Sequence, residues 1–162
     1  MNKELEQNLL TLPKHALNSE IEDLQARISY RISIALQYVS KSWHNHLTET
    51  AGDIADVIPY LRIFLEEKFL AWLEVLGVLG DVGSASVALE KLIFWLQEVC
   101  FVALVKLSCV KMSWNQVAKD SQLRDTAQDY LHFVAKFFEP INASATHIYH
   151  SALELCPASS IV

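Results

Sequence analysis

The sequence predicts an all-α fold, a single bundle of six or seven helices around a central apolar helix. Apolar residues recur at three- and four-residue spacing along the chain, and no segment alternates with the period of two that is typical of a half-buried strand. The 162 residues are 52% hydrophobic and 20% charged, with four glycines and four prolines, which favours a folded core over disorder. This length suits one domain, so we expect residues 1–162 to form a single helical domain.

The first third of the chain predicts three helices. A short helix is expected over residues 3–12, because the residue before Pro13 avoids the helical region. Ser19 and Glu22 have the spacing of a capping box, so a second helix is expected to begin at Ser19. That helix continues into a longer one, whose core face is the stripe formed by Ile32, Leu36, Val39, Trp43 and Leu47.

The middle of the chain predicts one bent helix followed by a turn. Asp56 is a candidate cap, and Pro59 fits near a helix start, where its missing donor would be unpaired anyway. The apolar face rotates near Glu66 and Glu67, which indicates a break or bend there. Glycines at 77, 80 and 83 indicate a turn in which positive φ is inexpensive.

The last part of the chain predicts the longest helix and two more. Ser84 is expected to cap the longest helix, which extends to about Val110 and is apolar nearly all round, as in the middle of a bundle. A further helix is expected to follow Asn115 and to end at Glu139-Pro140. A last short helix is expected over residues 144–155.

The distribution of charge argues against two classes of partner. The formal net charge is −6, and Lys and Arg are scattered singly, so neither nucleic acid nor an anionic membrane surface is an expected partner. Residues 92–110 are the candidate membrane span, but they contain Gln97, Glu98 and Lys106. Because a charge at the bilayer centre costs about 2.5–3.5 kcal/mol, we predict a buried helix and no membrane span.

The cysteines and the first residues indicate a cytoplasmic protein. Cys100, Cys109 and Cys156 form an odd set without close spacing, which is typical of reduced thiols. The polar, acidic start lacks the apolar core of a secretory signal. Cys100 and Cys109 lie in aliphatic sequence, so we expect small core residues rather than nucleophiles.

No set of residues predicts a metal or cofactor site. His147 and His150 would share a helix face with Cys156 nearby, but no fourth zinc ligand is evident. A di-iron bundle needs Glu-x-x-His pairs, whereas the chain offers only Asp129-x-x-His132. We therefore predict no metal, no cofactor and no catalytic residues, and we expect that the protein is not an enzyme. An enzyme would instead bring several ionisable groups together in one cleft, such as Glu98, Lys106, Asp129 and His132.

The aromatic residues leave two interpretations open. Ordinary core packing is the favoured one, and a cavity for an apolar ligand between helices is the other. An aromatic residue left exposed would instead mark a protein interface. The residues concerned are Trp43, Trp72, Trp95, Trp114, Phe64, Phe69, Phe94 and Phe101.

The order of several short motifs resembles a known family. The motifs are MNKEL (1–5), LNSEI (17–21), LQARI (24–28), ALQY (35–38), FLEEKFLAWLEVL (64–76), HIYHSAL (147–153) and CPASSIV (156–162). Together they look like the helical region that follows the NACHT nucleotide-binding module, often before a WD-repeat propeller, in mushroom-type fungal NLR-like signalling proteins. The resemblance implies a helical connector without catalytic residues of its own.

Two functions follow as hypotheses. The first is a non-catalytic connector or protein-interaction module, whose partners the resemblance implies to be NACHT and WD-repeat domains, in the same chain or another. The alternative is a carrier of a small apolar ligand or lipid, which would use an aromatic-lined cavity between helices.

Overall fold

The computed structural model describes residues 1–14, 16–49, 54–106 and 114–155. Its α-helices are α1 (Leu24–Arg31), α2 (Ile34–Glu49), α3 (Ile54–Ile63), α4 (Phe69–Val78), α5 (Gly83–Lys106) and α6 (Trp114–Ala143). A 3₁₀ turn, η1 (Asn18–Glu20), and two π-helical turns, η2 (Phe64–Lys68) and η3 (Ile148–Ala152), complete the regular structure. The predicted all-α class is confirmed.

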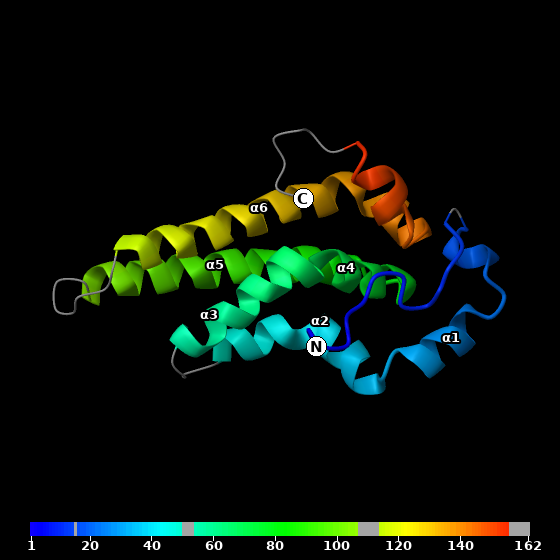
Figure 1. Ribbon diagram of the computed structural model, residues 1–162, viewed down its shortest axis with the longest axis horizontal. Coiled ribbons are helices and arrows are strands. Elements are labelled where there is room, and N and C mark those ends of the chain that lie inside the picture. Colours follow the sequence, from blue (N-terminus) through cyan, green and yellow to red (C-terminus); the bar gives the residue numbers. More distant parts are fainter. Residues whose placement is uncertain (15, 50–53, 107–113, 156–162) are drawn as a thin grey trace.

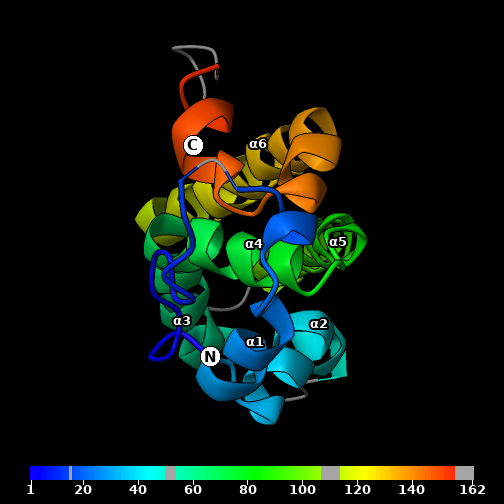
Figure 2. The same cartoon turned by 90° about the vertical axis from the view of Figure 1, so that its right-hand side faces the viewer.

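The helices are arranged in layers around α4 and α5. The long helices α5 and α6 lie side by side (Figure 1). Figure 2 shows α6 on one side of α4 and α5, and α1 and α2 on the other. Every residue of α4 except Leu70 is buried, so α4 is the most completely buried helix. In the described part of the longer helix α5, by contrast, Val87 and Phe94 are exposed.

The N-terminal segment contradicts the helix predicted over residues 3–12. These residues form turns and extended backbone, and Leu5, Leu10 and Leu12 are buried. Asn8 has a φ of 51°, and its Oδ1 accepts a hydrogen bond from the Leu12 amide at 2.7 Å. Asn tolerates left-handed backbone and bonds to nearby peptide groups, so a local turn replaces the helix.

The capping box predicted at Ser19 is also wrong. The Glu20 amide donates to the Leu17 carbonyl oxygen at 3.0 Å and closes the 3₁₀ turn η1, while the Leu17 amide donates to Glu20 Oε2 at 3.0 Å. The helix α1 begins only at Leu24. The chain then breaks at Ile32, and Ser33 Oγ accepts from the Leu36 amide at 3.0 Å at the start of α2.

The predicted α2 stripe is confirmed as a core face. Ile32, Leu36, Trp43 and Leu47 are buried, and Val39 is partly buried.

The bend predicted near Glu66 and Glu67 is confirmed as the π turn η2. A π turn contains one residue more than an α turn, so it rotates the apolar face between α3 and α4. Asp56 lies inside the first turn of α3 and is not its cap, since the helix already begins at Ile54. Pro59 is consequently inside α3 rather than at its start.

The glycines have separate roles. Gly80 has a φ of 66° and makes the predicted turn after α4. Gly77 lies inside α4 instead, where a Cβ atom would meet the Ala145 Cβ at 3.1 Å and the Ile141 carbonyl oxygen at 3.2 Å. Gly77 therefore allows α4 to approach the end of α6 closely.

The end of α6 differs from its prediction. The helix does not stop at Pro140 but kinks at Phe137, with φ −109° and ψ 17°, and continues to Ala143. A proline removes one helical hydrogen bond and crowds the preceding turn, and here the helix accommodates it by kinking. Within the described residues α6 spans 30 residues and α5 spans 24, and the predicted end of α5 near Val110 lies outside them. The turn η3 replaces most of the helix predicted over residues 144–155.

Candidate functional site

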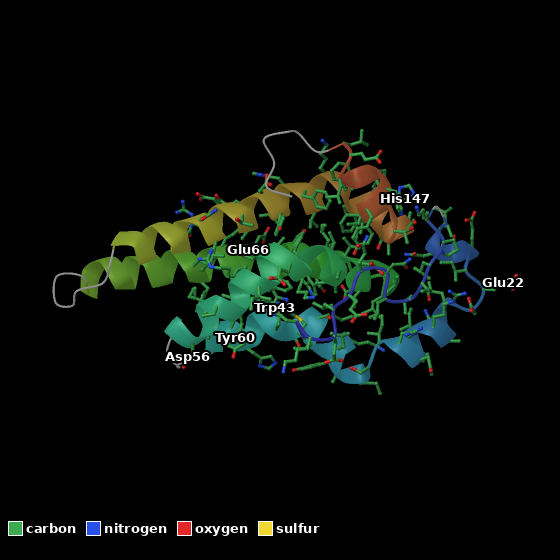
Figure 3. All side chains as sticks on the ribbon, in the orientation of Figure 1. Glu22, Trp43, Asp56, Tyr60, Glu66 and His147 are labelled. Atoms are coloured by element: carbon green, nitrogen blue, oxygen red, sulfur yellow. The ribbon has the colours of Figure 1, made fainter. Side chains whose placement is uncertain are left out.

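A cleft opens where the N-terminal residues meet α2 and α3, and Figure 3 labels Trp43 and Tyr60 on these two helices. We call it the α2–α3 cleft. Its volume is about 250 Å³. Its lining is almost entirely apolar and aromatic and consists of Met1, Asn2, Trp43, His46, Leu47, Val57, Tyr60, Leu61 and Phe64.

Aromatic rings in contact connect this cleft to the core. The Trp43 ring lies 5.2 Å from Phe64 and 6.1 Å from Trp72, measured between ring centroids. Phe69 contacts Trp72 at 5.7 Å and stacks on Tyr130 of α6 at 3.7 Å. Trp43, Phe64, Phe69 and Trp72 are thus core residues, as the favoured interpretation predicted, while Trp43 and Phe64 also border the cleft. The side chains of Phe101 and Trp114 lie outside the described residues.

Two of these aromatic residues form buried hydrogen bonds. Trp72 Nε1 donates to the Ser40 carbonyl oxygen at 2.9 Å. The Tyr130 hydroxyl donates to the Leu65 carbonyl oxygen at 2.7 Å, within the π turn η2. Burial, followed by the charges of Asp129 and Glu66, raises the pKa of Tyr130 to about 12. Tyr130 therefore remains a hydrogen-bond donor at neutral pH.

One turn of α2 holds buried polar atoms without hydrogen-bond partners among the described residues. They are Ser40 Oγ, Trp43 Nε1 and His44 Nδ1. Burial, with the charge of Lys91 as a second cause, lowers the pKa of His44, so its ring is neutral at neutral pH. A buried donor without a partner costs about 1–3 kcal/mol, so each such atom is a candidate for an external partner. Trp43 alone among the three also lines the α2–α3 cleft.

A second hollow, the α5–α6 groove, lies between the two long helices. Its volume is about 270 Å³, and its lining is Glu90, Ile93, Phe94, Gln97, Gln128, Leu131 and His132. Phe94 is 62% exposed there. Glu90 is exposed and forms no ion pair with another described residue, whereas the neighbouring Lys91 donates to Asn45 on α2 at 2.7 Å. The groove thus combines apolar side chains with one free carboxylate.

Glu74 is a buried carboxylate, whereas charged side chains ordinarily lie on the solvated face of a helix. It lies on α4 with 1% exposure, and its Oε2 accepts a hydrogen bond from the Asn8 amide at 2.8 Å. The Tyr149 hydroxyl lies beside it, although the geometry falls short of a full hydrogen bond. Burial raises the pKa of Glu74 despite the hydrogen bonds that oppose the shift, and burial and the Glu74 charge raise the pKa of Tyr149.

Of the ionisable residues that an enzyme would have brought together, only His132 is among the described residues that line the α5–α6 groove. His132 lines the α5–α6 groove, but neither Asp129 nor Glu98 does. The side chain of Lys106 lies outside the described residues. Glu90 and His132 both line this groove, which the sequence did not show because they lie on two different helices.

The possible metal ligands are only partly described. His147 Nδ1 lies 2.9 Å from Ser151 Oγ, while Cys156 and Cys109 lie outside the described residues, as does the side chain of Cys100. Where side chains are described, no three His, Cys, Asp or Glu residues group closely enough to hold a metal ion. The predictions for the cysteines are therefore not tested.

Over the described residues, no helix combines the length and the apolar character needed to span a bilayer. Comparison of the chain with protein-family models, with curated proteins and with solved structures finds no match. The resemblance to post-NACHT regions therefore stays a prediction from the sequence motifs.

Proposed function

We propose that this domain is a non-catalytic protein-interaction module that binds an amphipathic helix of another protein in the α5–α6 groove. The observation that carries this proposal is Phe94, a large aromatic side chain that is 62% exposed on the wall of a groove. Aromatic side chains are enriched at protein interfaces, and grooves between helices commonly receive the apolar face of a partner helix.

The lining of the groove specifies the chemistry of the partner. Ile93, Phe94 and Leu131 offer contacts for an apolar anchor. The groove carries negative charge, because Glu90 is in its lining and no Lys or Arg is. The whole chain is also acidic, with a formal net charge of −6. A partner helix with an apolar anchor beside a Lys or Arg complements this surface.

The motif resemblance supplies the class of partner. On that basis we propose a connector between a NACHT module and a WD-repeat propeller, or a protein that binds such domains in trans, in the cytoplasm. The odd number of widely spaced cysteines supports the compartment, and the dispersed Lys and Arg residues support a protein rather than a nucleic acid as partner.

Calorimetric titration of the purified domain with NACHT and WD-repeat segments from the same source tests this function. We expect Phe94→Glu to weaken binding at least about tenfold, or about 1.4 kcal/mol, because it places a charge on the apolar wall beside Glu90. Tyr30→Glu is the matched control, since Tyr30 is 86% exposed and lies outside the groove.

Two results would count against the proposal. If the folded domain binds neither segment, the connector function is wrong. If Tyr30→Glu weakens binding and Phe94→Glu does not, the domain interacts through α1 and α2 and not through the groove.

A further inference from the structure

We infer that the α2–α3 cleft is a binding site for a small, uncharged aromatic compound that carries a hydrogen-bond acceptor. This site is separate from the α5–α6 groove and would add ligand binding to the proposed protein interaction. Three properties of the cleft support it: its size and lining, its lack of Lys, Arg, Asp and Glu side chains, and an unpartnered buried donor.

The size of the cleft limits the ligand. Its volume of about 250 Å³ lies just below the roughly 300–1,000 Å³ of drug-sized pockets, so one ring or two fused rings fit. Trp43 and Phe64 form one wall and pack against Trp72, with centroid distances of 6.1 and 5.3 Å. Tyr60, which is 68% exposed, presents a further ring for stacking at the mouth.

The lining contains no charged side chain to pair with an ionic ligand. None of its residues is Lys, Arg, Asp or Glu. His46, at the rim, has its Nε2 3.3 Å from the hydroxyl of Tyr38. A charged ligand would lose its hydration without gaining an ion pair with any of these side chains, so a neutral compound is favoured.

The Trp43 indole defines the polar requirement. Trp43 is only 9% exposed, and its Nε1–H meets no acceptor among the described residues. Trp72 shows the contrast, since its Nε1 already donates to Ser40. Neighbouring atoms cover Trp43 Nε1, so the indole must turn slightly toward the cleft for a ligand oxygen to reach it. A ligand acceptor would then remove the cost of an unpaired donor.

The test compares three compounds of similar shape on the intact chain. The probes are 1-indanone, which has a carbonyl acceptor, indane, which has none, and 1-indanecarboxylate, which is charged. Binding is measured by titration while the indole N–H resonances are followed by NMR. We expect 1-indanone to bind at least about tenfold more tightly than indane, because one added hydrogen bond of about 1.4 kcal/mol corresponds to a tenfold change in affinity. Binding of 1-indanone should also shift the Trp43 resonance. The carboxylate should bind more weakly than 1-indanone.

Variants assign the site. Trp43→Phe keeps a ring and removes the donor, so it should reduce the affinity for 1-indanone to that for indane. Val57→Trp fills the cleft from a partly exposed position and should abolish binding while the circular dichroism spectrum stays helical. Trp95→Phe, outside the cleft, is the control and should leave binding unchanged.

The wild-type comparison decides the inference even if a variant fails to fold. Equal affinities for 1-indanone and indane, or no binding of 1-indanone up to its solubility limit, would overturn it. Undiminished binding to a folded Val57→Trp variant would overturn it as well. None of these results bears on the α5–α6 groove, so the two proposals fail independently.

Discussion

Replacing Glu74 with glutamine tests how the buried carboxylate of α4 affects stability. Glu74 is 1% exposed, and burial raises its pKa above the ordinary 4.5. Between pH 4.5 and the raised native pKa, the folded protein keeps a proton that the unfolded chain has released. The contribution of Glu74 to the free energy of unfolding is therefore complete below pH 4.5 and is lost as pH rises through the native pKa.

The size of the effect follows from one proton. A difference of one bound proton changes the free energy of unfolding by about 1.4 kcal/mol per pH unit. Glu74→Gln has no ionisable group here, and its amide oxygen remains able to accept from the Asn8 amide, which lies 2.8 Å from the native carboxylate. As pH rises above 4.5, the free energy of unfolding of the variant should increase relative to that of the wild type by at most about 1.4 kcal/mol per pH unit. The increase should level off above the native pKa of Glu74.

Urea unfolding between about pH 4 and pH 8 measures this difference curve, in which the other carboxylates cancel. Tyr149, the ionisable group beside Glu74, has a pKa raised from 10 and stays protonated throughout this range. Glu67→Gln, at an exposed carboxylate, is the control and should show no comparable pH-dependent gain. A Glu74→Gln difference that is constant or falls with pH would refute the reasoning.

Three further substitutions test the packing around α4 and the N-terminal turn. Gly77→Ala should lower the free energy of unfolding by about 1–3 kcal/mol, because contacts at 3.1–3.2 Å overpack the junction with α6, whereas Gly83→Ala, which meets no atom within 4 Å, should be neutral or slightly stabilising in thermal unfolding. Tyr130→Phe should cost about 1–2 kcal/mol and accelerate hydrogen exchange in η2, since it removes the 2.7 Å bond to a π-turn carbonyl; unchanged exchange would contradict that role. Asn8→Ala should cost about 1–3 kcal/mol, because it places Ala at a φ of 51° and removes the acceptor for the Leu12 amide, whose exchange rate is the readout.

The regular apolar spacing of the sequence predicted what depends on local geometry. The α2 stripe through Leu36, Trp43 and Leu47 is buried as expected, because residues three and four apart share one face of any α-helix. The bend at Glu66 and Glu67 was visible for the same reason, since a face that rotates requires an extra residue in the turn.

The failures involve residues whose partners are distant in sequence. The N-terminal leucines are buried without a helix because the segment packs on other elements, and its Asn8 amide bonds to Glu74, 66 positions away. Gly77 was interpreted as a turn residue because the sequence does not show Ala145 beside it. Pro140 was expected to end a helix, but η3 and the kinked end of α6 bury Ile141, Ala145 and Ile148, and that burial favours the continued helix.

The candidate sites divide in the same way. The sequence identified Trp43, Phe64 and Phe94 as notable aromatic residues but not which of them border a hollow. Both hollows form between segments separated along the chain: α5 with α6, and the N-terminal residues with α2 and α3.

By itself, the sequence determined the helical class and the buried face of α2, because both depend on a local periodicity of 3.6 residues. The tertiary structure alone decided that Glu74 is buried, that Gly77 is a contact point, that the Trp43 donor is left unpaired and that Phe94 stands exposed beside Glu90. Each of these depends on which elements meet in space and how closely they pack. The residues that meet can be far apart in the sequence, and Gly77 and Ala145 are separated by 68 positions.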